Sequence, residues 1–351
     1  MKRSHAWAKV TSLAMFAFAG PFGLASHAAA QEGLTIANYG GTAAKASSDI
    51  IWQPLAKKEG VTIKEDTLSG VADVRTQVIA NAVQWDIVEF TVDECAIGAK
   101  EGLFEKIDQT PYKGFGLSET NLTDDYVVIN SASYVLAWSK AKYGDNGPKS
   151  WADFWNTEKF PGTRALRNSP VHNLEAALMA DGVAAKDVYP IDIERAFKKL
   201  AEIKPSISVW WSSGGQAAQL ARDKEVDIIG IWNTRLQPII DADSSSFGYT
   251  WNGGVLVADC YAIPKNAPNA ELAKKIMPIA ASPEYQALLA NEKPISPTSP
   301  QAYENGLIKE EMLAKLPLSP QNRDRQVEML GPWWADNGAE IQGRWVEFMQ
   351  Q

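Results

Sequence analysis

The chain is poor in histidine and cysteine. Of its three histidines only His172 lies beyond residue 30, and its two cysteines are Cys95 and Cys260. A single histidine argues against histidine-based catalytic triads, and no set of His and Cys residues has the spacing of zinc ligands. The two cysteines lack the spacing of a disulfide framework. Two alternatives therefore remain open for them, a disulfide formed in an oxidising compartment or two buried free thiols.

Sequence motifs for nucleotide binding, covalent catalysis and ferric-ion binding are also missing. The first glycine pair after a predicted strand is not a G-x-G-x-x-G fingerprint, and no P-loop lysine follows it. No nucleophile elbow occurs, and no Tyr-Tyr pair offers the hard oxygen ligands that ferric ion prefers. An exported hydrolase or lyase that uses Asp93, Glu94 and Asp259 is the alternative from another class, but no catalytic histidine or metal set supports it. We therefore expect a binding protein with no enzymatic activity, no cofactor and no metal.

Long apolar runs are absent except near the N-terminus. There, three basic residues are followed by an apolar segment at 10–25, which Gly20 and Pro21 interrupt. The segment is shorter than the roughly 20 apolar residues of a membrane span, and small residues ending at Ala30 follow it at the spacing of a signal-peptidase site. We predict an export signal over residues 1–30, cleaved after Ala30, and a soluble mature protein in the periplasm.

Positive charge is in deficit. The chain has 34 Lys and Arg against 42 Asp and Glu, a formal net charge of −8. The predicted signal contains three basic and no acidic residues, so its removal changes the net charge to −11. This acidity disfavours nucleic acid as a partner and is compatible with cationic or zwitterionic solutes.

Segments with strand patterns alternate with segments of helical periodicity. A strand at 34–38 ends at Tyr39 and two glycines, and a helical pattern at 42–59 follows. The same alternation continues along the chain and is typical of a doubly wound α/β sheet. With 351 residues and 45% apolar content, the chain is long enough for two lobes. Two strand-like pieces within 126–138 are interpreted as the first crossing to the second lobe.

The stretch 226–264 is interpreted as a strand, a ligand-facing turn and a return strand. The apolar run VDIIGIW ends at Trp232 and is followed by Arg235, where an α/β sheet presents its strand ends to ligand. The return strand contains one carboxylate, Asp259. Because an unpaired buried charge costs several kcal/mol, on the order of 3 or more, Asp259 needs a partner, and the ligand can supply it.

Further polar and aromatic residues follow other predicted strands. A strand that reaches Trp210 is followed by Ser213 at the start of a helix, where hydroxyl and amide groups can hold an anion or simply cap the helix. Asn168 and Ser169 follow the strand before it in the chain. These residues are added to the predicted site.

Several blocks of the sequence together resemble the polyamine-type solute-binding proteins of ABC importers. In order along the chain they are LTIANYGG, WDIVEF, EGLFEKID, KSWADFWNTEKFPG, EVDIIGIWN, GGVLVADCYAIPKNAPN and SPEYQALLA. The resemblance implies the α/β periplasmic-binding fold of type II, with two lobes, mixed sheets and a two-strand hinge that closes on ligand. It also implies a monomer that delivers its ligand to an inner-membrane ABC permease. The expected lobes are 31–130 with 260–310, and 131–259, with the helices of 311–351 packing across both.

The sequence departs from the polyamine binders at several positions. Asn168, Ser169 and His172 stand where those proteins carry acidic groups, and Val257 stands where they carry tryptophan. An arginine three residues after Trp232 is also unlike a diamine site. These departures resemble the γ-aminobutyrate branch of the family, in which an arginine holds the carboxylate of the ligand and an aspartate holds its amine.

The resemblance therefore implies a site for an ω-amino acid. Arg235 would take a carboxylate, Asp259 an ammonium, and the rings of Trp232, Trp210 and Tyr39 would enclose the methylenes. Putrescine or spermidine remains the alternative ligand. Structural roles also remain open: Arg235 could form a surface salt bridge to Asp241 or Asp243, and Asp259 could pair with a structural cation. The predicted ligand-binding set is Arg235, Asp259, Trp232, Tyr39, Trp210, Ser213, Ser169 and Asn168.

Overall fold

The computed structural model describes residues 33–351, so the predicted export signal lies outside the described residues. Ten strands of this part form one mixed sheet with the order β2-β1-β3-β8-β4-β7-β5-β6, while β10 pairs with β8 and β9 with β4. The strands are β1 (Gly33–Asn38), β2 (Thr62–Thr67), β3 (Ile87–Thr91), β4 (Tyr126–Ser139), β5 (Arg164–Arg167), β6 (Ile207–Trp211), β7 (Ile228–Trp232), β8 (Phe247–Ala262), β9 (Ser296–Pro297) and β10 (Val327–Glu328).

Helices follow most of the strands, as the alternating pattern predicts. α1 continues through a π-helical segment, Ser48–Trp52, into α2. The α-helices are α1 (Gly41–Ser47), α2 (Gln53–Glu59), α3 (Val71–Ile79), α4 (Val92–Lys100), α5 (Lys140–Tyr143), α6 (Trp151–Trp155), α7 (Asn173–Ala180), α8 (Ile193–Ile203), α9 (Gly214–Arg222), α10 (Asn233–Ala242), α11 (Ala270–Ala280), α12 (Pro283–Ala290), α13 (Gln301–Glu304), α14 (Glu310–Leu313) and α15 (Gly331–Gln350). None of the helices within 33–351 has the length and apolarity needed to cross a membrane.

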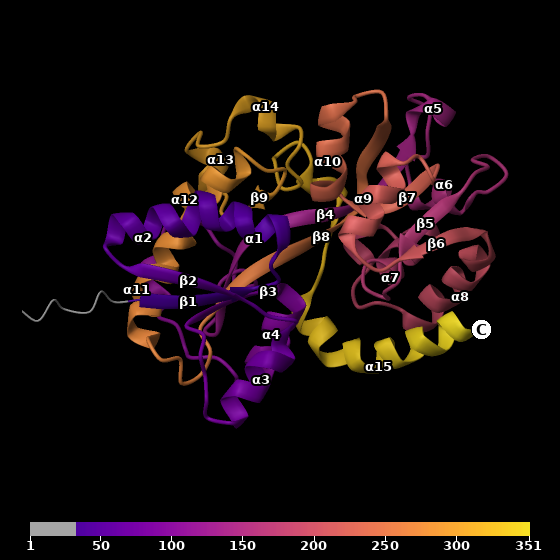
Figure 1. The fold of residues 1–351 in the computed structure, drawn as a ribbon. Coiled ribbons are helices and arrows are strands. Elements are labelled where there is room, and N and C mark those ends of the chain that lie inside the picture. Colours follow the sequence, from indigo (N-terminus) through magenta and orange to yellow (C-terminus); the bar gives the residue numbers. More distant parts are fainter. Residues whose placement is uncertain (1–32) are drawn as a thin grey trace, which may run out of the picture. The chain divides into compact units, whose positions relative to one another are not determined.

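The two longest strands, β4 and β8, lie in the middle of the sheet and pair with each other (Figure 1). On one side, β8 pairs antiparallel with β3, which begins the parallel group β3-β1-β2. On the other side, β4 pairs antiparallel with β7, which begins the parallel group β7-β5-β6. Every residue of β4 is buried, because it has neighbours on both edges and both faces. Two parallel groups joined by two long strands fit the predicted mixed sheet. The predicted boundaries between the lobes stay a prediction.

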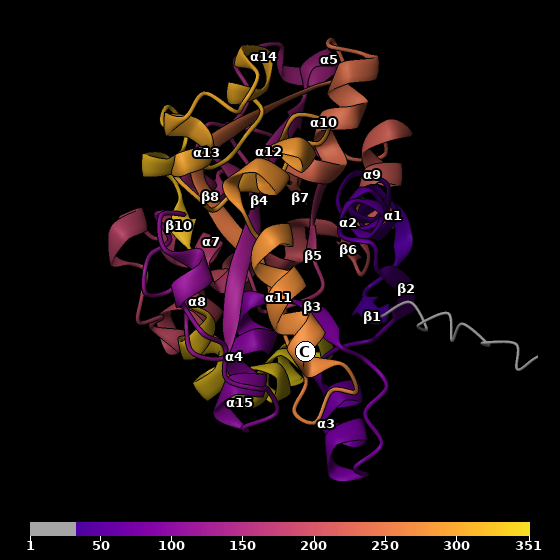
Figure 2. The same ribbon diagram turned by 90° about the vertical axis from the view of Figure 1, so that its left-hand side faces the viewer.

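Apolar faces of the helices cover the sheet. α11 lies in front of the strands in the view of Figure 2, and its buried residues Ile276 and Met277 belong to the same core as Ile36 of β1 and Ile87 of β3. A larger core extends over the other strands and includes Trp334 and other residues of α15. Helix formation in these segments thus follows from burial of one apolar face.

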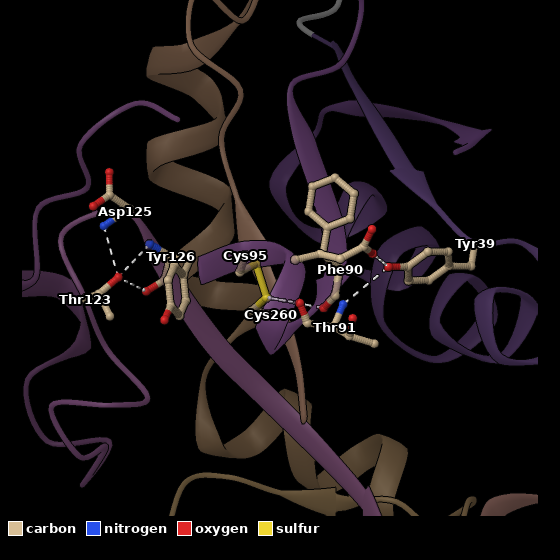
Figure 3. The surroundings of a disulfide bond; sticks show 9 residues. Tyr39, Phe90, Thr91, Cys95, Thr123, Asp125, Tyr126 and Cys260 are labelled. Atoms are coloured by element: carbon tan, nitrogen blue, oxygen red, sulfur yellow. Dashed lines mark hydrogen bonds between the residues drawn. A yellow bond between two sulfur atoms is a disulfide. The ribbon is translucent and has the colours of Figure 1, made fainter. Parts of the chain in front are cut away.

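The structure joins Cys95 of α4 to Cys260 of β8 in a disulfide with an S–S distance of 1.99 Å (Figure 3). Both cysteines are fully buried. Of the two alternatives that the sequence left open, the structure therefore has the disulfide, and it ties α4 to the long strand that carries Asp259.

The structure contradicts the predicted turn within 226–264. The helix α10 lies between β7 and β8, and the return strand begins at Phe247. Buried Leu236 and Ile239, three residues apart, give this segment the periodicity of a helix that packs one face on the core. Pro238 inside the segment disguises this signal, because proline usually interrupts a helix. The segment 126–138 also differs from the prediction, since its two strand-like pieces are one strand.

Candidate ligand-binding site

One face of the central strands carries Trp232 at one end and Asp259 at the other. In the sheet, Trp232 of β7 is opposite Tyr134 of β4, which is opposite Val255 of β8. Residues opposite each other share a face, and so do alternate residues of one strand, so Val255, Val257 and Asp259 follow one another on this face. Asp259 lies four positions after Val255 along the strand, a rise of roughly 13 Å. Trp232 and Asp259 are thus brought onto one surface.

Arg235 lies in the first turn of α10, three residues after Trp232, and is half-buried. Its side chain lies against Gly214, the first residue of α9. A methyl group at Gly214 would be 2.8 Å from Nε of Arg235 and 3.3 Å from the ring of Trp232. The distance to Nε is too short for a carbon atom and the distance to the ring is tight, so the missing side chain of Gly214 makes room for the arginine. Arg235 and Trp232 therefore share one location at the N-terminal ends of α9 and α10.

Asp259 lies among other polar groups. It is opposite Thr91 of β3 and Asn130 of β4, and Glu89 lies two residues before Thr91 on the same face. Burial, together with the charge of Asp93 and opposed by a hydrogen bond from Asn130, raises the pKa of Asp259 to about 7. Burial, and then the charge of Asp259, raises the pKa of Glu89 to about 8. These carboxyl groups thus lie where ionisation is unfavourable without a cation.

Two acceptor atoms in this group lack donors. Within residues 33–351, Oε2 of Glu89 and Oδ1 of Asn130 are buried and have no hydrogen-bond partner. Unpaired buried acceptors are costly, typically by about 1 to 3 kcal/mol each. A bound ammonium group would supply the missing donors and the missing positive charge. We call Asp259, Glu89 and Asn130 the acidic end of the site.

A second arginine, Arg167, was not among the predicted residues. It is the last residue of β5, and its guanidinium carbon lies 4.9 Å from the centre of the Trp232 ring. Its Nη1 lies 3.4 Å from Nδ1 of His172, whose ring stacks on Tyr134 with centroids 5.0 Å apart. The sequence did contain a signal for Arg167, because it ends a strand as Trp232 does. Reasoning from the sequence selected the neighbouring Asn168 and Ser169 instead.

Trp232 joins these groups. Its ring meets Trp211 edge to face at 5.2 Å and His172 at 6.0 Å. Burial and the charge of Arg167 lower the pKa of His172 well below its usual value, so this histidine is neutral and adds no charge. We call Trp232, Arg235 and Arg167 the basic end of the site.

Trp210 and Asn168 contact α15. The rings of Trp210 and Trp345 meet edge to face at 5.6 Å, and Nε1 of Trp345 donates a hydrogen bond of 2.9 Å to Oδ1 of Asn168. Ser169 is half-buried, and its hydroxyl accepts a hydrogen bond of 3.3 Å from the backbone N–H of Val171. These three predicted residues thus have contacts that hold the ends of β5 and β6 in place.

Tyr39 and Ser213 are exposed. The hydroxyl of Tyr39 donates to Oε2 of Glu94, and the ring lies beside Phe90 (Figure 3). Glu94 also accepts a hydrogen bond of 3.1 Å from the backbone N–H of Val71. Ser213 caps α9, accepting from the N–H of Gln216 at 3.2 Å. The side chains of Tyr39 and Ser213 are thus accessible to solvent, and Glu94 accepts hydrogen bonds from Tyr39 and from the backbone of Val71.

Comparison with known proteins gives the following similarities. A family model for bacterial extracellular solute-binding proteins matches residues 51–315. A gamma-aminobutyric acid-binding protein of Pseudomonas aeruginosa is 32% identical over 337 residues, which cover 92% of this chain and 93% of that protein. The structure of an ABC transporter substrate-binding protein from Bradyrhizobium japonicum is 40% identical with a TM-score of 0.87, covering 91% of this chain and 100% of that one. The periplasmic binding protein MotA of A. tumefaciens B6, in complex with glucopine, is 35% identical with a TM-score of 0.80, covering 90% and 99%.

Proposed function

Since this chain belongs to the bacterial extracellular solute-binding proteins, we propose that it captures a small amino-bearing zwitterion for an ABC importer, with γ-aminobutyrate or a related ω-amino acid as ligand. Membership of the family confirms the predicted fold class and the prediction of a transport component that is not an enzyme. The similar proteins include a binder of γ-aminobutyrate and a binder of glucopine, so family membership alone does not select the ligand. The choice rests on the site residues.

The separation of charge along one face of the sheet carries the proposal. At the acidic end, Asp259 and the unpaired acceptors of Glu89 and Asn130 suit the donors and charge of an ammonium group. At the basic end, the guanidinium of Arg235 offers a fork of donors that matches a carboxylate. A ligand with one group of each sign would place its ammonium at the acidic end and its carboxylate at the basic end, so that neither of its own charges is desolvated without a partner.

The aromatic ring of Trp232 suits the part of the ligand between its charges. The indole is half-buried, is held by Trp211 and His172, and lies next to Arg235 in the chain. A flat apolar ring beside a carboxylate site can cover a short run of methylenes and exclude water from the charged groups. Closure of the predicted lobes would complete this enclosure. We further propose that the mature protein acts as a monomer in the periplasm and passes its ligand to an inner-membrane permease.

A polyamine is the second candidate, and the acidic end favours it. Asp259, Glu89 and Asp93 bring three carboxyl groups to the neighbourhood of one another. A polyamine, however, has an ammonium group at each end, and the basic end would repel the second one at close range. Two guanidinium groups beside the same indole therefore favour the zwitterion.

Replacement of Arg235 tests the proposal. In the variant Arg235→Gln the fork of donors loses its charge, and we expect the affinity for γ-aminobutyrate to fall by about 2 to 5 kcal/mol, which is roughly 30-fold to several thousand-fold. The measurement is isothermal titration calorimetry at pH 7.5. Arg222→Gln is the matched control, because Arg222 is an exposed arginine at the end of α9. Affinity equal to that of the control would remove Arg235 from the site and with it the zwitterion assignment.

A further inference from the structure

Two arginines at the ends of β5 have opposite environments. Arg164, the first residue of the strand, is buried, and its guanidinium donates hydrogen bonds to the backbone carbonyls of Phe154 at 2.9 Å, Gly162 at 2.8 Å and Phe160. These bonds use all three of its nitrogens. Arg164 is therefore a structural arginine, each of whose three nitrogens donates to a carbonyl oxygen inside the protein.

Arg167, the last residue of the strand, lacks such partners. A guanidinium carries five N–H donors. Within residues 33–351, the contact with Nδ1 of His172 at 3.4 Å is the one hydrogen bond of this side chain, and no carboxylate lies within 4 Å of it. The side chain is half-buried, and this burial lowers the pKa of Arg167. Most of its donors thus have no partner in the described part of the protein, and the half-buried side chain leaves them within reach of a ligand.

The surroundings of Arg167 do not neutralise its charge. His172 is uncharged, and the hydroxyl of Tyr134 accepts from the backbone N–H of Arg167, at 3.3 Å, rather than from its guanidinium. Asp93 is the carboxylate whose charge acts on Arg167, and it does so from beyond ion-pair distance. The indole of Trp232, on which the guanidinium lies, is a weak partner for a cation. Its own Nε1–H is buried without a hydrogen-bond partner among residues 33–351. An anion beside Trp232 could accept hydrogen bonds both from the guanidinium of Arg167 and from Nε1–H of Trp232.

We infer that Arg167 binds a second acidic group of the ligand, so that the ligand is an amino compound with two carboxylates rather than one. This inference rests on the proposed function, because it takes Arg235 as the residue for the first carboxylate and Asp259 as the residue for the amine. Both arginines adjoin the ring of Trp232, one through its guanidinium and the other through its neighbouring position in the chain. The ligand class is therefore an amino dicarboxylate whose acidic groups both reach the basic end of the site.

Three probes test the ligand class directly. γ-Aminobutyrate has one carboxylate, (2-aminoethyl)malonate adds a second on the carbon that bears the first, and 3-(aminomethyl)glutarate adds a second through a methylene on the middle carbon, so that in both the two carboxylates lie away from the amine. We expect at least one dicarboxylate to bind about tenfold or more tightly than γ-aminobutyrate in calorimetry, since a half-buried guanidinium without an ion-pair partner gains a carboxylate. Weaker binding of both dicarboxylates than of γ-aminobutyrate would overturn the inference.

The variant Arg167→Gln then assigns the preference to this residue. We expect the ratio of the affinity for the preferred dicarboxylate to that for γ-aminobutyrate to fall by about tenfold or more. Arg167→Lys keeps the charge without the fork, and we expect it to retain part of the preference. Thermal melting without ligand shows whether each variant is folded.

Two other outcomes have distinct meanings. If Arg167→Gln lowers the affinity for all three probes equally, and Asp93→Asn does the same with no additional loss in the double variant, Arg167 instead pairs with Asp93 and the inference is wrong. If Arg235→Gln leaves all affinities unchanged, the proposed function itself fails. A loss in Arg235→Gln with an unchanged ratio in Arg167→Gln overturns only the inference.

Discussion

Asp259→Asn is a substitution for which the structure predicts opposite effects on binding and on stability. The asparagine has nearly the same shape and can keep a hydrogen bond with Asn130, but it has no negative charge. Because Asp259 is half-buried and would face the ammonium of the ligand, we expect the affinity for γ-aminobutyrate to fall by about 2 to 5 kcal/mol, which is roughly 30-fold to several thousand-fold.

The free energy of unfolding without ligand should change in the other direction. Burial raises the pKa of Asp259 from 3.8 to about 7. Between about pH 4 and pH 7 the folded protein keeps a proton that the unfolded chain has lost, so the contribution of Asp259 to stability falls as pH rises through this window. Above pH 7 an ionised Asp259 destabilises the fold by between about 1 and 4 kcal/mol. Asparagine has no proton to lose, and the variant should therefore be more stable than the wild type by this amount at pH 8.

Urea unfolding at pH 4 and pH 8, together with calorimetry at pH 7.5, measures both effects. The stability gain should be near zero at pH 4 and largest at pH 8. Asp223→Asn, at an exposed position after α9, is the matched control and should show neither effect. A variant that is less stable than the wild type at pH 8 would show that Asp259 already has a cationic partner inside the protein. Wild-type affinity in the variant would place the carboxylate outside the binding site.

Two further predictions concern the packing around the site. Two substitutions of glycine differ in the space around the new methyl group. In Gly214→Ala this group would lie 2.8 Å from Nε of Arg235, so we expect the arginine to move and the affinity for γ-aminobutyrate to fall by about tenfold. Gly343→Ala on α15 is the control, because no atom lies within 4 Å of the new methyl group, and it should bind normally in the same titration. Removal of the disulfide in Cys95→Ala/Cys260→Ala releases a constraint between residues 165 positions apart and should lower the free energy of unfolding by about 2 to 5 kcal/mol in urea; equal stability of the oxidised wild type and the double variant would contradict this expectation.

The sequence predicted most elements of the fold because their signals are local. The apolar run of β7 and the strand at 34–38 with its following glycines have patterns that neighbouring residues establish. α10 was missed for a local reason as well, since Pro238 lies in the middle of a short helix that otherwise has a buried face. Its first turn nevertheless carries the predicted Arg235, so the position of the arginine after a strand end was informative although the element was assigned wrongly.

The site was predicted less completely because its geometry depends on pairing between distant segments. The neighbourhood of Glu89 and Asp259 results from antiparallel pairing of β3 with β8, about 170 residues later in the chain, and no local pattern specifies that register. The disulfide depends on the same pairing, which brings Cys260 beside α4. Arg167 reaches the ring of Trp232 through the parallel pairing of β5 with β7. These contacts become visible only when the strand order is known.

A titration of the wild type with four ligands tests the central claim most directly. γ-Aminobutyrate carries one charge of each sign, butyrate only the negative charge, n-butylamine only the positive charge, and putrescine two positive charges. With a guanidinium at one end of the face and a carboxylate at the other, γ-aminobutyrate should bind at least about 100-fold more tightly than each of the other three. Putrescine that binds more tightly than γ-aminobutyrate, or butyrate or butylamine that binds as well, would contradict the account.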